Sequence, residues 1–208
     1  MKAPRVRSMQ ARLTLLLGAI ALLVSSLAGA TLFWALKREV ERQEITEVSG
    51  KLELIDHLID MQNSARGLQD LGVTKGTRVG LCLPNTPYYV VAYFAVLRIG
   101  AVVVNFNPLY TEREMAHQVT DSGCEVMIAT DLALCLPKLE PLVGKTCLKR
   151  VVVCPFADAL PAIKRRAFLL FKRHDIAHEP HDLRYARWAN LIARDAEPDP
   201  VERHPNDL

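Results

Sequence analysis

Three histidines late in the chain have a spacing that metal sites use. His174, His178 and His181 follow one another at intervals of four and three residues. Two imidazoles four residues apart on a helix can share one metal ion. Pro180 would break such a helix before the third histidine, and the neighbouring residues are charged. Solvated surface histidines explain the pattern better, so we predict no metal site.

The common motifs of nucleotide and acyl-transfer chemistry do not occur in the 208 residues. The sequence contains no GxGxxG, no GxxxxGK[ST] and no GxSxG. These patterns cradle phosphates or carry a nucleophilic serine. The glycines that are present fall instead at the ends of expected helices. We therefore predict no catalytic and no cofactor-binding residue in this sequence.

Charge and cysteine content narrow the functional class further. The chain has 26 basic and 23 acidic residues and a formal net charge of +3, which does not favour nucleic-acid binding. Its five cysteines form no CxxC pair, and several lie in apolar runs. Reduced, buried thiols explain them better than disulfides or a zinc site. They are Cys82, Cys124, Cys135, Cys147 and Cys154.

One segment mixes basic and apolar residues along a predicted helix. Residues 161–173 read PAIKRRAFLLFKR. Such a helix can lie on an anionic membrane surface, or it can pack its apolar face against a sheet. We slightly favour packing against the sheet.

The first third of the chain differs in character from the rest. Residues 1–12 are a basic leader, and Leu13–Leu36 is a run of 24 residues without a charge. As a helix this run would extend roughly 36 Å, enough to cross a bilayer core of about 30 Å. We predict a single transmembrane helix. A signal peptide cleaved near Ala28-Gly29-Ala30 and a buried helix of a soluble protein are the alternatives.

Residues 37–63 continue as a charged amphipathic segment. Its apolar residues recur every three or four positions, which predicts a juxtamembrane helix. They are Ile45, Val48, Leu52, Ile55 and Ile59. Residues 1–62 as a whole resemble the first transmembrane segment of bacterial sensor histidine kinases. The phosphoacceptor helix and the ATP-binding domain of such kinases are absent from the sequence, so the resemblance implies no kinase activity.

From residue 64 to residue 208 strand and helix patterns alternate. Short, mostly apolar runs near 78–83, 101–105, 124–129 and 149–154 recur every 23–25 residues. Helical patterns separate them, and Thr111 with Glu114 forms a capping box at the start of one. This order predicts an α/β fold with a partial parallel sheet of βαβ units.

The amino-acid sequence of this part resembles that of the N-terminal subdomain of the adenylate-forming acyl-CoA synthetases. Asn105-Phe106-Asn107-Pro108-Leu109-Tyr110-Thr111 points to the long-chain fatty-acid–CoA ligases. The residues that carry the resemblance are expected to shape loops and end elements: Pro84, Asn85, Gly100, Asn105, Asn107, Pro108, Tyr110, Thr111 and Gly123.

The resemblance implies a reaction that joins a fatty acid to coenzyme A through an acyl-adenylate made from ATP. It implies ATP, magnesium and coenzyme A for the full-length enzyme, and a fatty acid as substrate. The phosphate loop and the C-terminal motifs of the family are not found in this sequence. We therefore expect an N-terminal fragment that is inactive by itself.

Location is where the two parts of the chain disagree. We expect a single-pass inner-membrane protein whose synthetase part lies in the cytoplasm, because a synthetase needs ATP and coenzyme A. The topology of a sensor kinase would instead place the residues after the span in the periplasm. Basic residues near the span are balanced, so the charge rule decides nothing. The alternatives are a membrane signalling or interaction protein and an artefactual fusion of two reading frames.

Overall fold

The structure is a computed structural model that describes residues 56–193 and 196–202, together with residues 23, 25–27, 31, 33, 34 and 37. The chain divides into two compact units, Met1–Leu54 and Ile55–Leu208. The elements of the second unit are β1 (Arg78–Cys82), α2 (Pro87–Arg98), β2 (Val102–Asn105), α3 (Glu112–Ser122), β3 (Val126–Thr130), α4 (Leu136–Leu139), β4 (Arg150–Cys154), η1 (Phe156–Ala159), α5 (Ala162–Phe171), η2 (Arg173–Asp175), β5 (Tyr185–Arg187) and α6 (Trp188–Ile192).

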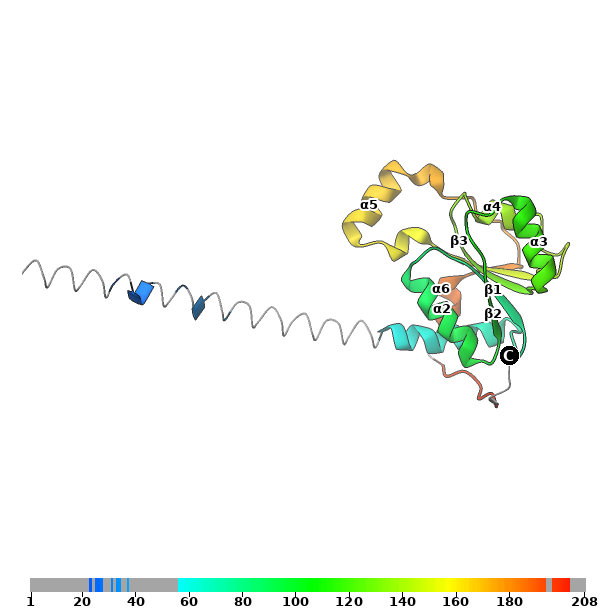
Figure 1. The fold of residues 1–208 in the computed structure, drawn as a ribbon, viewed down its shortest axis with the longest axis horizontal. Helices are drawn as coiled ribbons and strands as arrows, with labels where there is room; N and C mark the ends of the chain where they lie inside the picture. The colour runs from blue at the N-terminus through cyan, green and yellow to red at the C-terminus, as the bar shows by residue number, and fades with distance from the viewer. Residues whose placement is uncertain are drawn as a thin grey trace, which may run out of the picture. The chain divides into compact units, whose positions relative to one another are not determined.

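Five strands form one sheet in the order β2-β1-β3-β4-β5 (Figure 1). Every neighbouring pair is parallel. Val79 of β1, for example, pairs with Val103 on one side and with Val126 on the other. The predicted α/β fold and the four predicted parallel strands are therefore confirmed, and β5 is an additional strand.

Side chains alternate between two cores because successive strand residues point to opposite faces of a sheet. Val79 and Leu81 of β1 join one core, which also contains residues of α2, α6 and the helix at residues 56–70. Cys82 joins the other core, which is built with α3 and α4. The result is a sheet with helices on both faces.

Local sequence explains the ends of the helices beside the sheet. Pro87 opens α2, where its missing N–H costs nothing. Thr111 caps α3: its side chain accepts a hydrogen bond from the Glu114 amide, and the Glu114 carboxylate accepts one from the Thr111 amide. The predicted capping box is thus confirmed. Gly123 ends α3 with a positive φ of 64°, which favours glycine.

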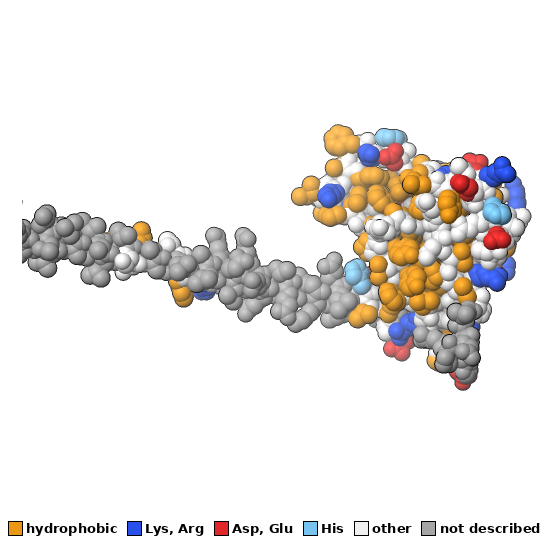
Figure 2. Space-filling view, in the orientation of Figure 1, with side chains coloured by type: hydrophobic (Ala, Val, Ile, Leu, Met, Phe, Trp, Pro, Cys, Tyr) orange, Lys and Arg blue, Asp and Glu red, His pale blue; other side chains and the backbone are white. Residues whose placement is uncertain are grey.

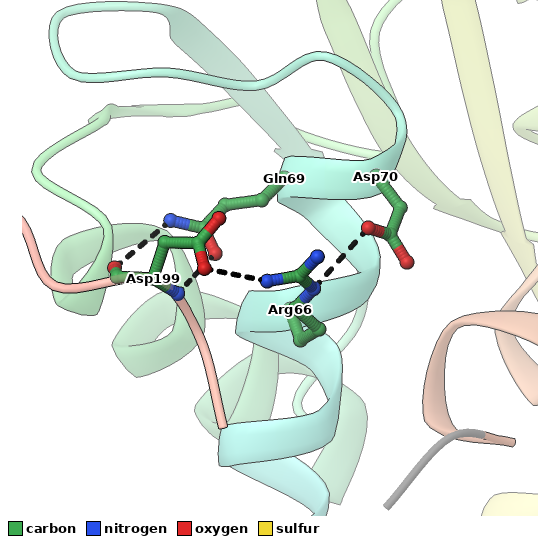
Figure 3. A network of polar contacts seen from close by, with 4 residues as sticks. All are labelled: Arg66, Gln69, Asp70 and Asp199. Carbon is green, nitrogen blue, oxygen red and sulfur yellow. Dashed lines mark hydrogen bonds and ion pairs between the residues drawn. The ribbon is translucent and has the colours of Figure 1, made fainter. Parts of the chain in front are cut away.

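The segment around Asp199, called the strap below, lies on the helix at residues 56–70 (Figure 3). Arg66 Nη1 lies 2.7 Å from Asp199 Oδ1, and Arg66 Nε lies 3.2 Å from Asp70 Oδ1. Gln69 donates to the Asp199 carbonyl at 3.1 Å and accepts from the Asp199 amide at 2.8 Å. One side-chain ion pair and two hydrogen bonds to the Asp199 backbone therefore hold this late segment against an early helix.

The structure corrects one prediction about residues 161–173. These residues form a helix, α5, but no residue of α5 is buried. Trp188 and Leu191 of α6, by contrast, belong to the core on one face of the sheet. The preferred prediction of packing against the sheet was therefore wrong.

The predicted leader at residues 1–12 lies outside the described residues, as does most of the predicted transmembrane helix at 13–36. The described positions of that helix are helical, and Leu23, Leu27, Phe33 and Trp34 are exposed. Among the residues that the structure describes, no helix has both the length and the hydropathy needed to cross a membrane.

The predicted juxtamembrane helix at 37–63 is described only at Lys37 and from residue 56 onward. Residues 56–70 form one continuous helix that runs across the predicted boundary between residues 63 and 64. Ala65 and Leu68 are fully buried in the core of the α/β unit. The last part of the predicted juxtamembrane segment therefore belongs to the same helix as the start of the predicted synthetase part.

Candidate functional site

The order of the strands marks one edge of the sheet as the candidate site. From β1 the chain first adds β2 on one side and then returns to add β3 on the other. Helix α2 packs with one core and α3 with the other. In open parallel sheets, ligands bind beyond the carboxyl ends of the strands where the order reverses. Here that point lies between β1 and β3.

The loop after β2 is the best-defined part of this edge. The Asn105 side chain accepts a hydrogen bond from the Tyr89 hydroxyl at 3.0 Å. Asn107 Oδ1 accepts from the Leu109 amide at 3.0 Å, and its carbonyl accepts from the Tyr110 amide at 3.0 Å. These bonds make a tight turn of the kind that asparagine favours, and they set the start of α3.

Lys138 of α4 also holds the loop after β2 in place. Lys138 Nζ donates to the Tyr110 carbonyl at 2.5 Å and lies 3.5 Å from the Pro108 carbonyl. Pro108 and Tyr110 therefore contribute backbone acceptors as well as side chains. The loop is therefore fixed at both ends, by the Asn105 side chain at its start and by the Thr111 cap at its end.

The other motif residues lie at two edges of the sheet. Pro84 and Asn85 follow β1 at the carboxyl edge, and the Pro84 carbonyl accepts a hydrogen bond from the Thr86 hydroxyl at 3.3 Å. Gly100 and Gly123 precede β2 and β3 at the opposite edge, both with positive φ. The nine motif residues thus do not converge on one point.

A cavity of about 330 Å³ opens beside the carboxyl ends of β1 and β4. Tyr88 and Trp188 meet in it edge to face, with ring centroids 5.4 Å apart. Asp60 and Asp158 add carboxylates, and His57 adds an imidazole. The remaining walls are mostly apolar: Pro87, Val91, Pro155, Ala159, Ala189 and Ile192.

Burial controls the charges around this cavity. Burial raises the pKa of the Asp60 carboxyl, and the neighbouring His57 partly offsets that rise. Burial also raises the pKa of the Tyr88 hydroxyl, so the phenol stays protonated near neutral pH. Asp158 is held by Arg165, whose Nη2 lies 2.6 Å from Asp158 Oδ1. The cavity therefore offers an aromatic, proton-donating wall with carboxylates at its rim.

Two polar side chains lie at the end of β3 next to this region, the buried Thr130 and the half-buried Asp131. Asp131 Oδ1 accepts a hydrogen bond from the Phe156 amide at 2.8 Å, while burial raises the pKa of its carboxyl. The Thr130 hydroxyl is fully buried and has no hydrogen-bond partner among the described residues. An unpaired buried hydroxyl is costly, so Thr130 is an unusual residue at the carboxyl edge.

The lining of the cavity defines the kind of group that it could hold. Among the described residues, no hydrogen bond joins a hydroxyl or thiol in the cavity to His57 or to a carboxylate as a nucleophile and base would be joined. An apolar or aromatic group with a donor at one end would suit the walls of the cavity.

The late histidines do not assemble into a metal site. His178 and His181 lie edge to face with centroids 5.7 Å apart, and His174 lies 3.2 Å from Asp175. Within residues 56–193 and 196–202, and at the isolated described positions, no three histidine, cysteine, aspartate or glutamate side chains are grouped as metal ligands.

Sequence reasoning missed most of the cavity. Tyr88 and Trp188 are 100 positions apart and meet only because α2 and α6 pack on the same face. Asp60 lies in the helix that the sequence divided between two segments. The one available signal was Trp188 itself, since a tryptophan in a charged tail often marks a packing point.

Comparison with known proteins identifies the family of the α/β part. The family model described as AMP-binding enzyme matches residues 58–208. The chain is 44% identical over 97 residues to a long-chain-fatty-acid–CoA ligase of Escherichia coli O6:H1, covering 46% of this chain and 17% of that protein. It is 33% identical over 136 residues to the ligase of the same description in Bacillus subtilis, covering 65% and 24%.

A solved structure shares the fold. The crystal structure of an anthranilate CoA ligase in complex with anthranoyl-AMP matches with a TM-score of 0.53 and 20% identity, over 71% of this chain and 24% of that one. The chain thus spans about a quarter or less of the proteins it matches. The comparisons give no support to the resemblance of residues 1–62 to sensor histidine kinases.

Proposed function

We infer the function from one premise: the chain belongs to the AMP-binding enzyme family. We propose that residues 58–208 are the N-terminal α/β portion of a long-chain fatty-acid–CoA ligase, which makes acyl-CoA from ATP, a fatty acid and coenzyme A through an acyl-adenylate. The identity to two bacterial long-chain-fatty-acid–CoA ligases supports this choice within the family.

The observation that carries the proposal is the loop from Asn105 to Thr111. The residues of this loop are the ones that resemble long-chain ligases. The conformation of the loop is fixed by the Asn107 turn, by Lys138 and by the Thr111 cap. A loop held at both ends at the carboxyl edge is a scaffold for neighbouring parts of an enzyme. In this proposal the chain supplies positioning rather than chemistry.

The described residues do not by themselves fit a magnesium nucleotide. The glycines with positive φ follow helices or lie in turns, and none belongs to a glycine-rich phosphate loop. No group of three metal-ligating side chains occurs in the described part of the chain. No chemical step is therefore assigned to these residues, and ATP, magnesium and coenzyme A are left to the rest of such an enzyme.

A chimera tests the proposal. Residues 58–208 would replace the matching segment of the Escherichia coli ligase, and acyl-CoA formation would be measured with oleate and with anthranilate. We expect oleate-dependent activity and no anthranilate-dependent activity. A second chimera carrying the Bacillus subtilis segment shows whether such exchanges are tolerated. A folded chimera without activity, while this second chimera works, would contradict the proposal.

We also propose that the protein is a single-pass inner-membrane protein with its α/β part in the cytoplasm. The 24 uncharged residues from Leu13 to Leu36 support a span, and the need for ATP supports the cytoplasmic side. Expressed protein should stay in the membrane pellet after a wash with alkaline carbonate. Release into the supernatant would contradict the span.

A further inference from the structure

Helix α5 is attached to the rest of its unit along one side only. Phe168 packs against Phe156 of η1 with centroids 5.3 Å apart. Arg165 forms its ion pair with Asp158 of η1. No α5 residue is buried, and Figure 1 shows the helix standing apart from the helices that cover the sheet. These two contacts fix which side of α5 faces inward.

The opposite side of α5 is an exposed apolar strip. Ile163, Ala167, Leu170 and Phe171 follow at intervals of four, three and one residue, which places them on one helical face. Ile163 is 86% exposed, Leu170 74% and Phe171 73%. Three large apolar side chains left in water on ten residues are not explained by packing within the described part of the unit.

Basic residues border the strip. Lys164 and Arg166 lie on its two sides by helical spacing, and both are exposed. Lys172 and Arg173 follow at the end of the helix, and residues 161–173 contain no acidic residue. Figure 2 shows hydrophobic and basic side chains next to one another over this part of the molecule. The combination is apolar and cationic on the same surface.

We propose that α5 is an interfacial helix that lies on an anionic lipid surface. Ile163, Leu170 and Phe171 enter the boundary between headgroups and acyl chains, and Lys164 and Arg166 contact the anionic headgroups. An apolar strip bordered by cations is the pattern of helices that lie in the plane of a membrane. A protein groove would satisfy the apolar strip, but it would not by itself account for Lys164 and Arg166 on its two borders.

The proposal does not depend on the ligase function, although a lipid surface is where a fatty-acid substrate would be found. It also differs from the predicted span at 13–36, which would hold the chain on any bilayer regardless of charge. A test must therefore report on α5 itself.

Hydrogen exchange followed by mass spectrometry gives that local measurement on the full 208-residue chain. The protein is studied alone, with vesicles of phosphatidylcholine, and with vesicles in which about one lipid in four is phosphatidylglycerol. We expect amide exchange in residues 162–171 to slow by at least about tenfold on the anionic vesicles and to change little on the neutral ones. Exchange in β3 should be the same in all three samples and reports the fold.

Two variants separate charge from fold. Lys164→Glu with Arg166→Glu should abolish the slowing on anionic vesicles. Arg113→Glu with Lys145→Glu changes the net charge equally at exposed positions outside α5, and should leave the slowing intact. Leu170→Ser alters a side chain that is already in water, so it should weaken the slowing without unfolding the protein.

Three outcomes would overturn the proposal. Equal slowing on neutral and anionic vesicles would remove the role of the basic residues. Slowing without vesicles that grows with protein concentration would assign the strip to a second copy of the chain. No slowing on either vesicle would show that α5 does not bind lipid.

Discussion

The thiol sulfurs of Cys82 and Cys135 lie 2.8 Å apart inside the core, although the residues are 53 positions apart in the sequence. The hydrogen bond between them, together with burial, raises the pKa of the Cys82 thiol. Burial also raises the pKa of Cys124 to about 12 and that of Cys154 well above its usual range. The thiols of Cys82, Cys124 and Cys154 therefore stay protonated and poorly nucleophilic at neutral pH.

We expect the native protein to react rapidly with Ellman's reagent at no more than one of its five cysteines. Cys147 is the only cysteine that is not buried, so Cys147→Ser should remove the rapid reaction. All the cysteines present should react after unfolding in guanidinium chloride. Rapid native reaction of any thiol in the Cys147→Ser protein would contradict the buried arrangement.

Two glycines should differ in their response to alanine because different atoms oppose the new methyl group. At Gly67 a Cβ would lie 2.7 Å from the Leu191 carbonyl oxygen, which is backbone. At Gly80 it would lie 2.6 Å from the sulfur of Met127, the far end of a flexible side chain. We expect Gly67→Ala to lower the free energy of unfolding by about 1–3 kcal/mol, and Gly80→Ala to cost less. Urea denaturation measures both, and the reverse order would contradict the packing of α6.

These cases illustrate what the sequence could predict. The strands β1 to β4 were predictable because each is a short, mostly apolar run with a helical pattern before the next one. The three-residue strand β5 contains Arg187 and lies at the edge of the sheet, so it has no apolar pattern. Which helix covers the sheet also depended on tertiary packing: α5 and α6 both carry apolar residues, and of the two only α6 has buried residues.

Asp131 should make stability depend on pH in a defined direction. Because burial raises its pKa above the ordinary 3.8, the folded state binds the proton more tightly than the unfolded state. Its contribution to stability is complete below pH 3.8 and is lost as pH rises through the higher, folded-state pKa. Asp131→Asn keeps an acceptor for the Phe156 amide and removes the charge. We expect it to be as stable as the native protein or more so at pH 7, with the difference narrowing toward pH 4.

The contrast variant is Asp131→Ala, which removes the acceptor and leaves the Phe156 amide unpaired. It should lower the free energy of unfolding by about 1–3 kcal/mol at pH 7. Thermal unfolding over a pH series measures all three proteins. An Asp131→Asn variant that is less stable than the native protein at pH 7 would show that the charge itself is stabilising.

Thr130 offers a test of whether the carboxyl edge holds a hidden partner. Its hydroxyl is buried without a hydrogen bond among the described residues. Thr130→Val replaces that hydroxyl by a methyl group of similar size. We expect the free energy of unfolding to rise by about 1 kcal/mol. A loss of stability of that size would mean that the hydroxyl has a partner, such as an ordered water.

The outer side of α2 should bind hydrophobic dyes. Val90, Phe94 and Leu97 follow one another at helical spacing and are 54%, 51% and 39% exposed. We expect Phe94→Gln to reduce ANS fluorescence of the native protein. Leu109→Gln removes a more exposed apolar side chain that lies in a loop, and should change the fluorescence less. An equal decrease in the two variants would show that the α2 side chains do not act together.

The strap at Asp199 has a consequence for the order in which the protein folds. Its partners Arg66 and Gln69 are translated about 130 positions before it. At about 5–20 residues per second, a ribosome needs on the order of ten seconds to cover that distance. Turns and helix caps within a few residues can form during that interval, whereas these hydrogen bonds cannot. The helix at residues 56–70 therefore gains these contacts only after Asp199 has been synthesised, so a chaperone or protease can reach that side of it throughout the interval.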